Sequence, residues 1–319
     1  MTDAFQPSRR RLLGALSAAA LAAALPRPAR AASDTLRIGY QKYGTLVLLK
    51  AQGTLEKRLA PLGIQVKWAE FPGGPQLLEA LNVGSVDFGT TGETPPIFAQ
   101  AAGADLQYVA YEPPAPKGEA IVVAKDSPLK SVKDLKGKRV ALNKGSNVHY
   151  LLVKALEKAG LKYEDVQTVF LNPSDARAAF ERGSVDAWVI WDPFLVAAEH
   201  QLGARQLADG VGLVSNHQFY LASRRYAEQN GKVIKLIVEE LARLDAWARQ
   251  NFKDVAGQLS SQIGLDVNIV RVAAERGTYD VRLLDAKVIA EQQRIADVFH
   301  QLKLIPKPLS VKDIVWSGQ

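Results

Sequence analysis

A tetrapeptide that occurs twice, Gly-Ser-Val-Asp, most constrains how this chain can fold. The first copy spans residues 84–87 and the second spans 183–186. In both places a helical pattern ends, the chain turns at the glycine, and a β-like run follows. Because glycine adopts the left-handed conformation that commonly ends a helix, we predict that Gly84 and Gly183 cap two helices. The repeat therefore indicates two related units.

Each copy lies in a stretch where β-like runs alternate with helical patterns, which is typical of α/β folds. In the first unit the expected strands are 36–40, 64–70, 86–90, 107–111 and 120–125, and the expected helices are 47–60, 76–83 and 95–102. In the second unit the expected strands are 139–143, 167–170 and 185–190, and the expected helices are 148–159, 176–182 and 193–201. Long amphipathic helices are then predicted over 232–251 and 286–302.

This order predicts a chain that builds one lobe, crosses to a second lobe, and returns to complete the first. We assign the chain to a cleaved leader (1–31), the first lobe (32–126), the second lobe (127–218) and a return segment (219–319). The crossings are expected near 125–130 and 215–222. Each lobe should be a mostly parallel sheet flanked by helices, with a ligand cleft between the lobes.

The leader has the features of an export signal. Residues 9–11 are arginines, residues 12–25 are apolar, and an Ala-Arg-Ala pattern ends at Ala31. The apolar run is too short to anchor the chain in a bilayer. The string S-R-R-R-L-L at 8–13 fits twin-arginine (Tat) export as well as the general Sec route, and both stay open. We expect a soluble protein of the periplasm.

The composition excludes several kinds of site. The chain has no cysteine, so it can form no disulfide, no thiolate metal site and no cysteine-linked lipid anchor. Met1 is the only methionine, and a mature chain without sulfur fits either avoidance of oxidisable side chains or synthesis under sulfur shortage. The leader holds five arginines and one aspartate, which leaves a formal charge of +3 on the rest. That charge is too small to indicate a nucleic-acid partner.

Enzyme motifs are missing from the sequence. The patterns G-x-S-x-G, G-x-x-x-x-G-K-[ST] and H-E-x-x-H do not occur, and the four histidines are too scattered for a metal site. We therefore predict a binding protein that is not an enzyme, needs no cofactor and holds no metal.

The loops at the carboxyl ends of the predicted strands carry the candidate ligand residues. Parallel sheets bind ligands at this edge, and helix starts there offer free N–H groups to an anion. The predicted ligand-binding residues are Gln41, Thr91, Gly92, Glu93, Ser146, Asn147, His149, Trp191 and Asp192.

These residues have different expected roles. Gly92 allows close approach of the backbone, and Ser146 adds a hydroxyl donor. His149 is either a donor to the anion or a solvent-facing residue of a first helical turn. Trp191 should form a wall of the cleft. Asp192 either caps the following helix or bonds a polar group of the ligand.

Five strings resemble the aliphatic sulfonate-binding proteins of bacterial ABC importers. They are R-I-G-Y-Q-K (37–42), E-F-P-G-G-P-Q (70–76), E-A-L-N-V-G-S-V-D (79–87), T-G-E-T-P-P-I-F-A-Q-A-A-G-A-D-L (91–106) and V-D-A-W-V-I-W-D-P (185–193). The resemblance implies a two-lobed, type II-like periplasmic binding-protein fold. It also implies capture of an alkanesulfonate as a sulfur source and delivery to an ABC permease in the inner membrane, by a chain that we expect to be a monomer. The family pattern has Asp where this chain has Glu93, which could narrow the pocket.

Other functions remain as alternatives. The same fold could bind taurine, a sulfate ester or nitrate, and taurine would need a carboxylate such as Glu93 or Asp192 for its ammonium group. Enzymes of thiamine-pyrimidine synthesis share the fold but rely on histidine and cysteine. The effector module of a transcription regulator would need an N-terminal DNA-binding motif, where this chain has a leader.

Overall fold

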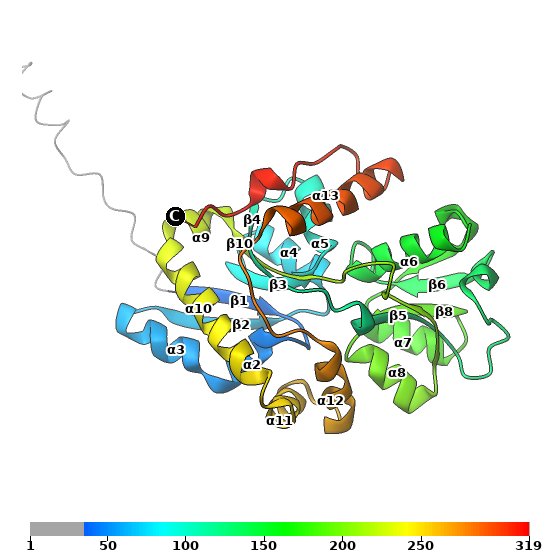
Figure 1. The fold of residues 1–319 in the computed structure, drawn as a ribbon, viewed down its shortest axis with the longest axis horizontal. Coiled ribbons are helices and arrows are strands. Elements are labelled where there is room, and N and C mark those ends of the chain that lie inside the picture. Colours follow the sequence, from blue (N-terminus) through cyan, green and yellow to red (C-terminus); the bar gives the residue numbers. More distant parts are fainter. Residues whose placement is uncertain (1–34, 319) are drawn as a thin grey trace, which may run out of the picture. The chain divides into compact units, whose positions relative to one another are not determined.

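The computed structural model describes residues 35–318, so the predicted leader lies outside the described residues. Two five-stranded sheets organise this part of the chain, and helices flank both of them (Figure 1). The two-lobed α/β fold expected from the sequence is confirmed. Among residues 35–318, no helix is both long and apolar enough to cross a bilayer.

The first sheet combines strands from two distant parts of the chain. Its strands are β1 (Thr35–Tyr40), β2 (Gln65–Glu70), β3 (Phe88–Gly92), β4 (Leu106–Glu112) and β10 (Gln218–Ser223), in the order β2-β1-β3-β10-β4. The helices between these strands are α2 (Thr45–Gln52), α3 (Thr54–Leu59), α4 (Gly74–Asn82) and α5 (Pro95–Ala101). β1 pairs parallel with β2 and β3, whereas β10 returns antiparallel between β3 and β4.

The second sheet comes from one continuous stretch. Its strands are β5 (Glu119–Val123), β6 (Arg139–Leu142), β7 (Gln167–Phe170), β8 (Ala187–Trp191) and β9 (Arg205–Asp209), in the order β7-β6-β8-β5-β9. Its helices are α6 (Asn147–Lys158), α7 (Pro173–Glu181) and α8 (Phe194–Leu202). The inner strands β5 and β8 are buried along their whole length, while the edge strand β7 is half-exposed.

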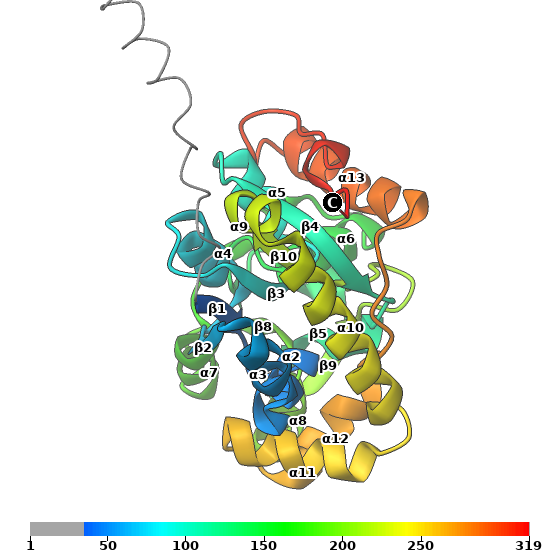
Figure 2. The same cartoon turned by 90° about the vertical axis from the view of Figure 1, so that its left-hand side faces the viewer.

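Five helices follow the second sheet. They are α9 (Arg224–Gln229), α10 (Gly231–Ala248), α11 (Phe252–Ile263), α12 (Val267–Arg276) and α13 (Ala286–Gln301). α10 shares an apolar core with α2 and β1. α11 and α12 lie side by side (Figure 2). α12 also contacts α8, where Ile269 packs against Val196 and Ala197, so the return segment reaches both lobes.

The sheet order corrects one prediction. The strand expected over 120–125 was placed in the first unit, but β5 pairs with β8 and β9 of the second sheet. The first crossing therefore lies at 113–118 and the second at 210–217. A buried apolar run looks the same in either sheet, so its sequence could not reveal its partners. Both sheets are mixed, because the strands next to the crossings run antiparallel to their neighbours.

Both copies of the Gly-Ser-Val-Asp repeat have the same local structure. Gly84 and Gly183 have φ angles of 75° and 68°, which confirms the predicted left-handed caps. In each copy the serine N–H donates to the helix carbonyl five residues earlier, at 2.8 Å.

The aspartate of each copy clamps the start of a neighbouring strand. Asp87 accepts from the backbone N–H of Arg37 at 2.9 Å and from its Nε at 2.8 Å. Asp186 accepts in the same way from the backbone N–H of Arg139 at 2.8 Å. The two clamps differ in burial, since the Asp87 side chain is 6% exposed and the Asp186 side chain 33%.

Replacing Asp87 with asparagine should lower the free energy of unfolding by about 2 kcal/mol, because buried donors lose a charged acceptor. The matched change Asp186→Asn should cost less than about 1 kcal/mol, because that pair is open to water. Urea unfolding of the protein without its leader, followed by circular dichroism, measures both. Equal losses in the free energy of unfolding would show that the burial of Asp87 does not strengthen its contribution to stability.

Candidate functional site

Two crossing segments join the lobes, and they bind each other. The N–H of Ala115 donates to the carbonyl of Ser215 at 3.0 Å, and the N–H of Gly210 donates to the carbonyl of Pro116 at 3.0 Å. Asn216 adopts a left-handed φ of 53°. Its Nδ2 donates to the carbonyl of Ala115 at 2.9 Å. The crossings therefore form one hydrogen-bonded junction between the sheets.

A pocket of about 90 Å³ lies against this junction. Its lining comes from both lobes and from α11 and α12. The polar and charged side chains that line it are Lys42, Tyr43, Glu112, Asn147, Asp192, Asn216, Gln218, Arg276, Thr278 and Tyr279. This volume is large enough for several water-sized groups, so a small molecule can be enclosed.

Apolar side chains form part of the lining, and we call this part the apolar wall. Its side chains are Ala115, Trp191, Pro193, Leu259, Ile263, Val270, Ala273 and Ala274. The contributions of α11 and α12 to this wall were not predicted. Their apolar residues follow ordinary helical spacing, which in a sequence cannot be told from residues of a core. The wall provides a surface on which an alkyl chain can be buried.

Amide groups also line the pocket. Asn147 opens α6, and its Nδ2 donates to Asn216 Oδ1 at 2.7 Å and to Glu119 Oε2 at 2.6 Å. The hydroxyl of Tyr43 donates to Gln218 Oε1 at 2.7 Å. Gly44, which precedes α2, also lines the pocket. Among residues 35–318, no side chain caps α2 or α6, so each lobe presents the start of a helix here.

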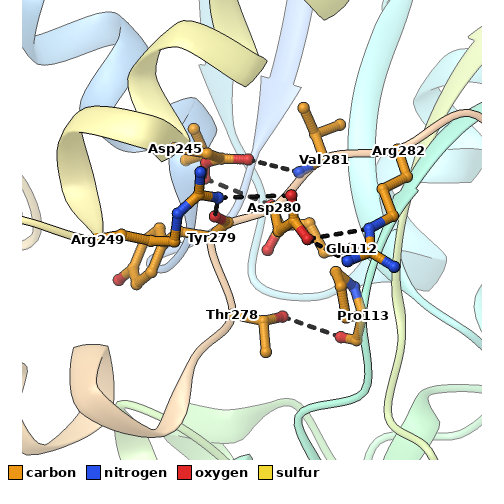
Figure 3. A network of polar contacts seen from close by, with 10 residues as sticks. Glu112, Pro113, Asp245, Arg249, Thr278, Tyr279, Asp280, Val281 and Arg282 are labelled. Carbon is orange, nitrogen blue, oxygen red and sulfur yellow. Dashed lines mark hydrogen bonds and ion pairs between the residues drawn. The ribbon is translucent and has the colours of Figure 1, made fainter.

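The segment between α12 and α13 is fixed to the first lobe (Figure 3). Thr278 Oγ1 donates to the carbonyl of Pro113 at 2.9 Å, and the N–H of Val281 donates to Asp245 Oδ2 at 2.8 Å. Thr45 Oγ1 donates to Asp245 Oδ1 at 2.6 Å. Burial raises the pKa of Asp245 to about 6. Burial, together with the charge of Asp245, raises the pKa of Glu112 well above its usual range.

Three of the predicted ligand residues, Asn147, Trp191 and Asp192, line the pocket. Asp192 precedes a cis proline, Pro193. Gly92 lies just behind Asn147: a Cβ atom at Gly92 would be only 2.6 Å from Asn147 Oδ1. The close approach expected of this glycine is therefore made by a side chain of the other lobe.

The remaining predicted residues do not line this pocket, and their polar groups bond the protein itself. Gln41 Nε2 donates to the carbonyl of Thr90 at 3.1 Å, and Thr91 Oγ1 to the carbonyl of Gly92 at 3.0 Å. Ser146 Oγ donates to the carbonyl of Asn143 at 2.7 Å. A strand end locates a loop but does not determine which way each side chain points.

Glu93 and His149 are buried elsewhere. Glu93 lines a second, polar cavity, and its Oε2 accepts from the N–H of His217 at 3.0 Å. Burial raises the pKa of Glu93 to about 7. The two ring nitrogens of His149 bond the N–H of Gly145 at 3.2 Å and the hydroxyl of Tyr163 at 2.7 Å. Burial lowers the pKa of His149 to about 4, so its ring is neutral at pH 7.

Known proteins resemble this chain along most of its length. A family model described as NMT1/THI5 like matches residues 60–251. A protein of Escherichia coli (strain K12) named for binding aliphatic sulfonates is 47% identical over 307 residues, which are 96% of this chain and 94% of that protein.

Two solved structures share the fold. The alkanesulfonate-binding protein SsuA from Xanthomonas axonopodis pv. citri, bound to MOPS, superposes with a TM-score of 0.85 at 44% identity, over 90% of this chain and 99% of that chain. The periplasmic aliphatic sulphonate binding protein SsuA from Escherichia coli gives a TM-score of 0.80 at 47% identity, over 89% of this chain and 92% of that chain. The resemblance noted in the sequence is thus confirmed, and the chain belongs to the NMT1/THI5-like family, with aliphatic sulfonate-binding proteins as its relatives.

Proposed function

We propose that this protein is the periplasmic substrate-binding component of an ABC importer, and that it captures aliphatic sulfonates and delivers them to the permease. The observation that carries the proposal is a pocket whose lining combines apolar side chains with amide groups and with residues at the starts of α2 and α6. Such a pocket matches a ligand with a charged oxyanion at one end and an alkyl chain at the other. The relatives named above are binding proteins, and we propose binding without turnover by a monomer.

The oxyanion end would lie between the starts of α2 and α6. Free N–H groups and the positive dipole end of each helix favour negative charge. Asn216 and Gln218 line the pocket with amide groups, and Lys42 adds a positive charge. We place Asn147 beside these groups as the residue that brings the second lobe to the ligand.

The two-lobed lining also suggests how binding is signalled. A ligand held by groups from both lobes stabilises the closed arrangement more than an open one, because only the closed arrangement makes both sets of contacts. The permease would then recognise the closed protein.

The apolar wall separates the proposal from nitrate binding. Nitrate has no carbon chain, so it would leave Trp191, Ile263 and Val270 without a partner. A sulfate ester would use the wall as a sulfonate does, and only direct titration separates these two ligands.

Calorimetric titration with methanesulfonate through pentanesulfonate should show tighter binding for each added methylene, by about fourfold. The gain should stop when the tail fills the pocket. Sulfate and nitrate should bind more weakly than every member of the series. Tight nitrate binding without a dependence on tail length would contradict the proposal.

Replacing Trp191 with leucine should weaken pentanesulfonate binding by about 10-fold and affect methanesulfonate less, since only the longer tail reaches the wall. Trp68→Leu is the matched control, because Trp68 lies on β2 and does not line the pocket. Its affinities should equal those of the wild type. If Trp191→Leu weakens the binding of every sulfonate in the series by the same factor, Trp191 does not contact the alkyl tail.

Replacing Gly92 with alanine should weaken binding by at least about 10-fold, because the new methyl group would displace Asn147. Gly257→Ala is a control in α11, where a Cβ atom meets nothing within 4 Å. That change should leave affinity unaltered and stabilise the helix by up to about 1 kcal/mol. Wild-type affinity in a folded Gly92→Ala protein would show that the ligand does not depend on the position of Asn147.

A further inference from the structure

Glu112 is a buried glutamate that lines the pocket, and its carboxyl group lies beside the start of α2. The residue is 5% exposed. Thr45 is the first residue of α2, and its Oγ1 lies 3.4 Å from Glu112 Oε1. The proposed function places the oxyanion of the ligand at this helix start. An ionised carboxylate there would repel the ligand, so binding depends on whether Glu112 carries a proton.

The hydrogen bonds around Glu112 determine which of its oxygens can carry that proton. The hydroxyl of Thr45 has a single proton, which it donates to Asp245 Oδ1 at 2.6 Å. The hydroxyl of Tyr220 donates to Glu112 Oε1, so Oε1 is an acceptor. Among residues 35–318, Glu112 Oε2 has no hydrogen-bond partner. A proton on Glu112 would therefore occupy Oε2 and make that oxygen a donor.

The neighbouring carboxyl group of Asp245 is better placed to hold a negative charge. Both of its oxygens accept hydrogen bonds, Oδ1 from Thr45 and Oδ2 from the N–H of Val281 at 2.8 Å. Two close carboxyl groups in a buried site do not both ionise readily, and the group with more donors keeps the charge. The arrangement favours the negative charge on Asp245 and the proton on Glu112.

The cations of this region pair with other carboxylates. Arg249 and Arg282 both pair with Asp280 (Figure 3). Lys42, which also lines the pocket, lies 3.8 Å from the carboxylate of the residue that ends β2. A positive charge next to Glu112 would favour its ionised form, and these pairs direct the available charges elsewhere.

The remaining groups around Glu112 act in the same direction. Burial, the charge of Asp245 and then the charge of Asp280 raise the pKa of Glu112 well above its usual range. Three phenols lie near Glu112, and burial raises the pKa of each of them, so they are neutral at pH 7. These phenols are Tyr43, Tyr220 and Tyr279.

We propose that Glu112 enters the binding site as a neutral carboxylic acid and donates a hydrogen bond from Oε2 to an oxygen of the bound sulfonate. The inference rests on the proposed function, because it needs the sulfonate beside the start of α2. A sulfonate suits such a donor, since it is fully ionised at neutral pH and its oxygens only accept hydrogen bonds. Glu112 then recognises the oxyanion without a positive charge of its own.

The first test compares two neutral replacements of Glu112 by calorimetric titration with pentanesulfonate at pH 7. Glu112→Met has no donor, so the affinity should fall by about 10- to 100-fold, as expected for a lost hydrogen bond to a charged group. Glu112→Gln supplies an N–H donor in place of the O–H, and it should recover all but about threefold of that loss. Equal affinities of the two variants, or tighter binding by both than by the wild type, would overturn the inference.

The second test observes the proton itself. The infrared difference spectrum between the pentanesulfonate-bound and the free protein at pH 7 should contain the carbonyl band of a protonated carboxyl group. This band should shift on binding, because the O–H gains an acceptor, and the shift should be absent from Glu112→Gln. A wild-type spectrum without the shift, or one that Glu112→Gln leaves unchanged, would overturn the inference even where Glu112→Met does not fold.

Glu240→Gln is the matched control. Glu240 is also a buried glutamate, 6% exposed, but it lies on α10 and does not line the pocket. It pairs with Arg58 at 3.0 Å and with Arg243 at 2.8 Å, which keep it ionised. Its replacement should leave the affinity and the infrared shift as in the wild type. A wild type that binds no sulfonate would contradict the proposed function itself, whereas sulfonate binding with a failure of either test removes only the role of Glu112.

Discussion

The pocket depends on the hydrogen-bonded junction of the two crossing segments. These segments lie about a hundred residues apart in the sequence, yet Ala115 bonds both the backbone of Ser215 and the side chain of Asn216. Because the junction consists of a few bonds between two extended segments, it can hold the lobes close and still allow them to rotate. Asn216 also lines the pocket, so the junction between the lobes is in contact with the space in which we propose that the ligand binds.

Buried carboxyl groups give this region its electrostatic character. Glu112 and Asp192 line the pocket, and Glu119 lies behind it as the partner of Asn147. Burial raises the pKa of Glu119 well above its usual range, and the charge of Glu93 adds to this effect. Under the proposed function, an anion would therefore be accommodated less by free positive side chains than by amide groups, helix starts and carboxyls that resist ionisation.

Features that depend on a few neighbouring residues could be predicted from the sequence. The repeated Gly-Ser-Val-Asp identified two helix caps and two related lobes, since a left-handed turn before a strand has a clear residue signature. Two other features depend on contacts between distant segments: the pairing of β5 with the second sheet, and the contribution of α11 and α12 to the apolar wall. They could not be predicted from local sequence patterns. Within the predicted loops, Asn147, Trp191 and Asp192 line the pocket, whereas Glu93 and His149 are buried elsewhere in the protein. That difference arises from tertiary packing.

The position of α12 has a consequence for how fast a ligand leaves. Its apolar side chains cover the pocket, while Ile269 and Arg276 attach it to α8 of the second lobe. If the lobes part on release, as the proposed function requires, the α12–α8 contact must separate, so its strength adds to the barrier for release but not to the cost of the first encounter. Residence time can therefore be tuned at α12, while the capture rate is set by diffusion and charge.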